Sequence, residues 1–127
     1  MHHVDVHVTS VPRSRKLLDA VMPAVGYTLR YEETDFVSYW CNGTRPAIGF
    51  IEDGTPVRAS AMRIAFGVAQ TDDVDSAARA AIDAGARNVE GPGFHPEYGD
   101  DYYAVFFEDS DGNKFEVVQD ATTCACA

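Results

Sequence analysis

The sequence predicts an α+β fold built from two similar modules, each with the element order βαβββ. Three observations support this prediction. Several short stretches alternate apolar and polar residues, which is the period of a half-buried strand. One stretch in each half instead carries apolar residues at helical spacing, directly after the first strand-like stretch of that half. Turn-forming pairs such as "NG" and "DG" separate the remaining strand-like stretches.

The first half begins with a predicted strand over residues 3–8, in which valines alternate with polar side chains. Ser10 can cap a helix over residues 11–22 that has Pro12 in its first turn. This helix should end at Met22, because the residue before a proline disfavours the helical conformation. The stretches "GYTLRYEE", "FVSYWC" and "PAIGFIE" then predict three strands.

The second half repeats this order. "MRIAFGVA" predicts a strand whose apolar side consists of Ile64, Phe66 and Val68. A helix is expected over residues 72–84, with Gly85 at its C-terminal end. "RNVEGPG", "YYAVFFED" and "NKFEVVQ" predict three more strands, and "SDGN" predicts a hairpin turn between the last two. Each module alone is too small to bury a core, so the two should pack together.

The chain of 127 residues suits one domain, and its hydrophobic content of 46% is sufficient for a core. We expect a single domain over residues 1–120. Its first module spans about 1–52, a linker 53–61, and the second module about 62–120. Residues 121–127, "ATTCACA", have small side chains and predict a flexible tail.

Composition restricts the partners. The formal net charge of −10 and the pI near 4.6 make nucleic acid and anionic membranes poor partners, and favour a cationic or neutral small molecule. Three cysteines, Cys41, Cys124 and Cys126, argue against a disulfide scaffold. No apolar run approaches the ~20 residues of a membrane span, and the N-terminus lacks a signal-peptide pattern. The expected location is therefore cytoplasmic.

Three stretches carry a family resemblance: "HVDVHVTSV", "RIAFGVAQTDDVDSAARAAIDAGA" and "YYAVFFEDSDGNKFEVVQ". In this order and spacing they resemble the vicinal oxygen chelate superfamily, which includes glyoxalase I, extradiol dioxygenases, and the bleomycin and fosfomycin resistance proteins. The resemblance covers about residues 2–119. "GPGFHPEYGDDYY" further resembles a bacterial glyoxalase-like subgroup. The resemblance implies a curved mixed sheet with helices on its convex side, a small-molecule ligand and a homodimer.

The resemblance also identifies four positions where metal-dependent members carry ligands. His3 stands at the first position, Gly49 at the second, Arg63 at the third and Glu116 at the last. Only His3 and Glu116 keep a ligating side chain, and two ligands are too few for a tight divalent site. Arg63 adds a fixed positive charge beside them. We therefore expect vestigial ligand positions, with no bound metal and no other cofactor.

Strand parity provides a second argument about these residues. If the valines of residues 3–8 face the helix, then His3, Asp5 and His7 face the other side, and Arg63 and Glu116 do so in the second module. The sequence thus predicts one shared cavity in which Arg63 hydrogen-bonds to Glu116. The cluster is either a purely structural network or an anion site. In the second case Arg63 and His3 would hold a substrate carboxylate, and Glu116 would orient it or act as a base.

The stretch "GFHPEYGDDYY" predicts either a lid over the cavity or an ordinary loop packed on the sheet edge. Its aromatic and titratable candidates for ligand contact are Phe94, His95, Tyr98, Tyr102 and Tyr103. Tyr39 and Trp40 could form another wall. As strand neighbours they face opposite sides, so one of them should lie in the core.

Two functions remain open. One is a lyase or isomerase of the glyoxalase kind, in which Arg63 would replace the metal as electrophile. The other is a non-catalytic protein that sequesters a cationic or aromatic antibiotic-like compound. Extradiol dioxygenase activity is disfavoured because it requires a redox iron site. The sequence does not identify the compound.

Overall fold

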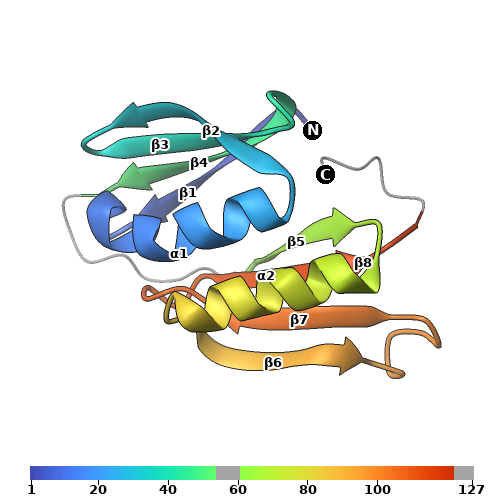
Figure 1. The fold of residues 1–127 in the computed structure, drawn as a ribbon. Helices are drawn as coiled ribbons and strands as arrows, with labels where there is room; N and C mark the ends of the chain where they lie inside the picture. The colour runs from blue at the N-terminus through green and yellow to red at the C-terminus, as the bar shows by residue number, and fades with distance from the viewer. Residues whose placement is uncertain (54–60, 122–127) are drawn as a thin grey trace.

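The computed structural model describes residues 1–53 and 61–121, and Figure 1 shows their arrangement as two βαβββ modules. The elements of the first module are β1 (His3–Val8), α1 (Val11–Ala24), β2 (Tyr27–Glu33), β3 (Phe36–Cys41) and β4 (Thr44–Glu52). The elements of the second module are β5 (Arg63–Val68), α2 (Thr71–Asp83), β6 (Arg87–Phe94), β7 (Tyr103–Glu108) and β8 (Lys114–Gln119). The predicted order is confirmed in both halves.

Both helices lie close to their predicted bounds. The hydroxyl of Ser10 accepts a hydrogen bond of 3.2 Å from the backbone N–H of Arg13, which caps α1 as expected. However, α1 passes its predicted end and includes Pro23. A proline in the last turn removes few helical hydrogen bonds, and the next turn still closes because the N–H of Val25 reaches the carbonyl of Val21 at 3.2 Å.

Each module forms its own four-stranded mixed sheet. Sheet A has the order β1-β4-β3-β2 and sheet B the order β5-β8-β7-β6. In each sheet the first strand of the module runs parallel to the last, and the other neighbours are antiparallel. Within the described residues no strand of sheet A pairs with a strand of sheet B. β1 and β5 are consequently edge strands.

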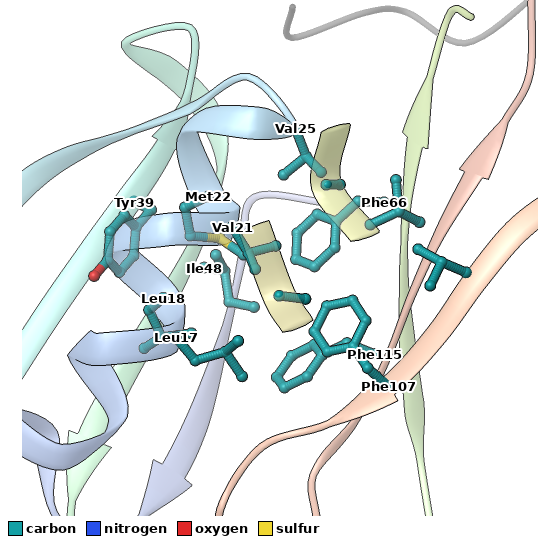
Figure 2. Close-up of a cluster of buried hydrophobic side chains, with 14 of the residues drawn as sticks. Leu17, Leu18, Val21, Met22, Val25, Tyr39, Ile48, Phe66, Phe107 and Phe115 are labelled. Atoms are coloured by element: carbon teal, nitrogen blue, oxygen red, sulfur yellow. The ribbon is translucent and has the colours of Figure 1, made fainter. Parts of the chain in front are cut away.

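The two modules share one hydrophobic core. Helices α1 and α2 pack against each other, and each covers one face of its own sheet (Figure 1). Figure 2 shows Leu18 and Met22 of α1 and Phe115 of β8 as members of one cluster of buried side chains. The rings of Phe50 and Phe115, one from each sheet, have centroids 6.3 Å apart. The face of each sheet that lies away from its helix, here called the outer face, is therefore directed away from this core.

A buried carboxylate adds a polar link between the modules. Asp111, in the turn before β8, has a side chain that is only 4% exposed. It accepts hydrogen bonds from the backbone N–H of Thr9 at 3.0 Å and from the Arg13 guanidinium at 2.7 Å. This turn is the predicted "SDGN" hairpin, so one sequence motif both reverses the chain and attaches module two to module one.

Two further expectations concern the chain outside this core. Cys41 is disulfide-bonded, although the cysteine pattern argued against a disulfide scaffold; Cys124 and Cys126 lie outside the described residues. Most of the predicted linker and tail, residues 54–60 and 122–127, also lies outside them. Within the described part, no helix is long and apolar enough to cross a membrane.

Candidate functional site

Equivalent positions of the two modules can be identified from the strand registers. Asp5 lies beside Gly49 in the parallel pair β1–β4, and Ala65 lies beside Glu116 in the parallel pair β5–β8. Because the strand order is the same in both sheets, Gly49 and Glu116 occupy equivalent positions, and so do Asp5 and Ala65. Side chains at directly paired positions point to the same face, so all four positions belong to the outer faces.

The same registers give three more equivalent pairs on the outer faces. They are His3 and Arg63, Ser38 and Phe106, and Ala47 and Lys114. In the last two pairs, as in the pair of Gly49 and Glu116, sheet A has the smaller side chain. At three equivalent positions, the outer face of sheet A therefore carries a smaller side chain than the outer face of sheet B.

The outer face of sheet A contains a pocket of about 290 Å³. Its lining residues are His3, Asp5, Tyr31, Phe36, Ser38, Trp40, Arg45, Ala47 and Gly49. A Cβ atom on Gly49 would lie 2.4 Å from Asp5 Oδ1 and 3.1 Å from the Phe36 ring, so the absence of a side chain there keeps the pocket open. The sequence predicted His3, Asp5 and Gly49 on this surface.

Aromatic and cationic groups lie together at this pocket. The guanidinium carbon of Arg45 is 3.9 Å from the centroid of the Trp40 ring, and that of Arg30 is 4.9 Å from the Tyr31 ring. The Trp40 indole N–H donates to Ser38 Oγ at 2.9 Å, which fixes the ring on the pocket wall. Among the described residues, neither arginine has a carboxylate within ion-pair distance.

The histidines of β1 have different environments. His3 Nε2 lies 3.5 Å from Asp5 Oδ2, and His3 Nδ1 lies 2.9 Å from the ring of His2. The positive charge of Arg45 is the main cause that lowers the pKa of His2. His7 instead pairs with Asp53 at 3.4 Å and does not line the pocket. Along β1 the pocket ends at Asp5, and contact of His7 with a ligand stays a prediction.

The outer face of sheet B is largely filled by the segment 95–102, which connects β6 to β7, and a hollow of only about 80 Å³ remains beside Arg63 and Lys114. His95 and Tyr98 pack on Phe106, with ring centroids 4.9 Å and 6.2 Å away. Tyr98 also contacts Tyr102, whose ring centroid lies 5.2 Å away. The predicted lid thus lies directly on the sheet. Of the two alternatives for this stretch, the packed loop describes the structure of this chain better than a lid over an open cavity.

Glu116 is buried beneath this segment and is 6% exposed. The Tyr102 hydroxyl donates a short hydrogen bond to Glu116 Oε2. Burial of the phenol, together with this hydrogen bond, raises the pKa of Tyr102 to about 12. A protonated phenol therefore satisfies the carboxylate.

Tyr103, predicted to contact the ligand, faces the other way. Its hydroxyl donates to Asp75 Oδ1 of α2 at 2.6 Å, and its ring packs against the shared core. Phe94 packs edge-on against Tyr103 at 5.1 Å and is otherwise exposed. Alternation along β7 explains the correction, because only every second residue of a strand can face the outer surface.

Arg63 does not form the predicted hydrogen bond with Glu116. It is exposed, and its guanidinium carbon lies 4.8 Å from the centroid of the Phe106 ring. The register explains this difference, since Ala65 is the β5 residue beside Glu116, and Arg63 lies two residues earlier. The prediction that Arg63 neutralises Glu116 is therefore wrong; the Tyr102 phenol instead donates a hydrogen bond to this carboxylate.

The sequence model of the Glyoxalase/Bleomycin resistance protein/Dioxygenase superfamily matches residues 1–117. The chain belongs to this superfamily. No curated protein matches its sequence significantly.

Solved structures of the superfamily share the fold of this chain. A glyoxalase/bleomycin resistance protein from Albidiferax ferrireducens T118 is 23% identical, with a TM-score of 0.79 over 94% of this chain and 98% of its own. A candidate glyoxalase from Bacillus halodurans is 26% identical, with a TM-score of 0.76 over 94% and 95%. The fosfomycin resistance protein FosX from Listeria monocytogenes, in complex with Mn(II) and dihydroxypropylphosphonic acid, is 17% identical, with a TM-score of 0.69 over 98% and 90%.

A divalent metal, such as the Mn(II) of the FosX complex, needs several ligating side chains close together. The described residues of one chain do not provide them. His3 lies on sheet A and Glu116 on sheet B, and in the described part of the chain the pocket at His3 does not extend to Glu116. Within residues 1–53 and 61–121, no three His, Cys, Asp or Glu side chains converge on one point. His3 is next to Asp5 alone, and Glu116 is occupied by a phenol. Within one copy, the described residues therefore do not assemble a metal site.

Sequence reasoning did not select Arg45 or Ser38, and it considered Trp40 only as one of two possible wall residues. The structure buries Tyr39 and places Trp40 at the pocket. The parity of β3 could have decided between these two, because Val37 and Tyr39 continue the apolar side of that strand. Arg45 lies at the start of β4, and its position over the ring of Trp40 depends on the turn geometry.

Proposed function

We propose that this protein binds a small organic molecule in the pocket on the outer face of sheet A. The observation that supports this proposal is a hollow of about 290 Å³ that combines three aromatic rings with a few convergent polar groups. Such a combination is typical of small-molecule sites, which usually have volumes of about 300–1,000 Å³. The volume favours a small ligand. FosX, which shares the fold, is also complexed with a small organic molecule.

The test uses Trp40, which is the only tryptophan of the chain and lines the pocket. A library of one- and two-ring compounds should contain molecules that change the emission of Trp40 saturably. The variant Ser38→Phe introduces the side chain that sheet B has at the equivalent position, and it should abolish these responses. The matched control is Ser76→Phe on α2, outside the pocket, which should leave them unchanged. Absence of any saturable response in the natural protein would contradict the proposal.

The proposal includes a homodimer. β1 and β5 are edge strands, and the backbone groups along an unpaired edge favour association with another strand. Pairing of β1 with β5 of a second copy would close both edges and place the two kinds of outer face side by side. Sedimentation velocity should give a species of twice the chain mass, and a monomer at every concentration used for binding would contradict this part.

A sequestering role fits the pocket better than catalysis, because Glu116 and Arg63, the expected base and electrophile, do not line it, although His3 and Asp5 do. A second candidate, an acid–base lyase or isomerase, is supported by one observation, the phenol–carboxylate pair of Tyr102 and Glu116. The segment 95–102 covers that pair, so a substrate could reach it only after this segment moved. Mass spectrometry of the ligand after incubation distinguishes the two roles: an unchanged ligand supports sequestration, and a converted ligand supports the enzyme.

A further inference from the structure

We infer that the ligand of the sheet A pocket is a flat molecule with an anionic group, such as an aromatic carboxylate, held by the guanidinium of Arg45. This inference rests on the proposed function and specifies the class of ligand. It reverses the expectation of a cationic ligand that the net charge suggested. The argument depends on the local charges at the pocket, the arrangement of Arg45 on Trp40, and the shape of the wall.

Unpaired cations are the first observation. Arg13 and Arg15 each hold a carboxylate within 3.1 Å. Arg45, which lines the pocket, and Arg30, which lies over the neighbouring Tyr31 and Trp40 rings, have no carboxylate within 4.0 Å among the described residues. Other described cations, such as Arg63 and Arg79, also lack an ion pair, but the guanidinium groups of Arg45 and Arg30 both lie beside one hollow. An anionic ligand would supply the missing partner.

The guanidinium of Arg45 is also held in place. Its central carbon is 3.9 Å from the centroid of Trp40, and Trp40 is fixed by its hydrogen bond to Ser38. A guanidinium stacked on an aromatic ring keeps its N–H donors at its edge, where they can bind a carboxylate with two parallel hydrogen bonds. Little side-chain freedom is then lost on binding, which is the main cost of forming an exposed ion pair.

The acidic groups of the chain do not cancel this local charge. Asp5 is the one carboxylate that lines the pocket, and it lies 3.5 Å from His3 Nε2. The positive charge of Arg45 is also the main cause that lowers the pKa of His2. Charges farther than the Debye length, about 8 Å at physiological salt, are largely screened. Arg45 is thus a charge in the pocket wall that has no carboxylate within 4.0 Å among the described residues, whereas Asp5 lies beside His3.

The shape of the wall selects a flat ligand. Phe36 and Trp40 provide apolar faces, while Gly49 and Ala47 leave the floor of the pocket without bulk. A volume of about 290 Å³ accommodates a molecule of about one aromatic ring with a short substituent. A ring lying against Trp40 or Phe36 would place its acidic substituent near Arg45.

The test compares three molecules of nearly the same shape but different charge: benzoate, benzamide and benzamidinium. Their affinities are measured by calorimetry, and the emission of Trp40 shows that each binds at the pocket. Single-ring ligands bind at about millimolar concentrations, so the titrations extend to that range. Benzoate should bind at least about tenfold more tightly than benzamide, which is the usual gain from hydrogen bonds to a charged group. Benzamidinium should bind most weakly.

Variants identify the residue responsible. Arg45→Met keeps most of the side-chain length and removes the charge, so it should weaken benzoate by about tenfold and leave benzamide unchanged. Arg79→Met on α2 makes the same change in net charge far from the pocket and should affect none of the three. Arg45→Lys keeps the charge but not the planar donors, and should give an intermediate affinity. It also provides a second variant if Arg45→Met fails to fold.

The outcomes separate this inference from the proposed function. Equal affinities for the three molecules, or tighter binding of benzamidinium, would overturn the anionic ligand and leave small-molecule binding intact. The anionic ligand would also be overturned, with small-molecule binding intact, if none of the three molecules binds while other library compounds still change the Trp40 emission. If no compound of any charge changes that emission, both proposals fail.

Discussion

The two modules have the same elements in the same order, yet the outer face of one is hollow and that of the other is filled. At one pair of equivalent positions sheet A has Gly49 and sheet B has Glu116. The connections differ as well, because β2 and β3 are joined by residues 34–35, and β6 and β7 by the long segment 95–102. The backbone fold therefore does not determine where a cavity forms. A few side-chain volumes and the length of one connection do.

The two faces also solve different electrostatic problems. Sheet B buries a carboxylate and satisfies it internally with the Tyr102 phenol, so that Glu116 has no need of an external partner. On sheet A, Arg30 and Arg45 have no carboxylate within 4.0 Å among residues 1–53 and 61–121, and they lie beside an open hollow. The filled face thus stabilises the fold, and the open face remains available for a ligand.

The largest expected effect is at the centre of the filled face. Phe106→Ala removes a ring that is 7% exposed and that His95 and Tyr98 cover. Such truncations cost about 3–5 kcal/mol of unfolding free energy, and here the lower end applies because the covering segment can partly collapse. Urea unfolding measures the change. The control Phe94→Ala removes a ring that is 64% exposed and should cost much less. Equal losses of unfolding free energy in the two variants would show that packing on the outer face of sheet B does not stabilise the fold.

A smaller loss is expected when the buried carboxylate loses its partner. Tyr102→Phe removes the hydroxyl that donates to Glu116 and leaves this carboxylate buried without that hydrogen bond. The expected cost is about 1–3 kcal/mol of unfolding free energy near neutral pH. Tyr98→Phe is the matched control, since Tyr98 is 59% exposed, and should be nearly neutral. A neutral Tyr102→Phe would mean that Glu116 finds another donor.

The same variant should change the pH dependence of stability. The pKa of Tyr102 is raised to about 12 in the folded state, whereas an unfolded tyrosine has a pKa of about 10. The protonated phenol therefore contributes stability that is complete below about pH 10 and is lost as the pH rises towards about 12. The difference in unfolding free energy between the natural protein and Tyr102→Phe should shrink over this interval. A constant difference would contradict the assignment of this titration to Tyr102.

On the open face, an added side-chain volume should cost little unfolding free energy but should weaken ligand binding. In Gly49→Ala the added Cβ would lie 2.4 Å from Asp5 Oδ1, which can swing away, and 3.1 Å from the Phe36 ring. Overpacking typically costs about 1–3 kcal/mol, and we expect the lower end because the Asp5 side chain is exposed and has room to change rotamer. Binding of pocket ligands, read by Trp40 emission, should weaken. Gly93→Ala, whose Cβ meets no atom within 4 Å, is the control. Unchanged binding in Gly49→Ala would place the ligand elsewhere.

Much of the fold could be predicted from the sequence, because strand alternation, helix caps and the "SDGN" turn are local signals. The site was harder to predict, because it depends on which surfaces meet in three dimensions. Parity correctly assigned His3 and Asp5 to an outer face. It could not show that Glu116 lies on a separate sheet, nor that Tyr102 rather than Arg63 reaches it. Those facts follow from module packing and from the path of a loop, which leave no periodic trace in the sequence.

The smallest effect is expected at the boundary of the open face. His7 lies two residues beyond Asp5 on β1 and forms an exposed pair with Asp53 at 3.4 Å, with side-chain exposures of 58% and 47%. Exposed pairs contribute about 0–1 kcal/mol, so His7→Ala should change the unfolding free energy very little. It should also leave ligand binding unchanged, whereas His3→Ala should weaken it because His3 lines the pocket. Both variants are compared by Trp40 emission and urea unfolding. If His7→Ala weakened binding as much as His3→Ala, the ligand would extend along β1 past Asp5, and the pocket would be larger than its lining residues indicate.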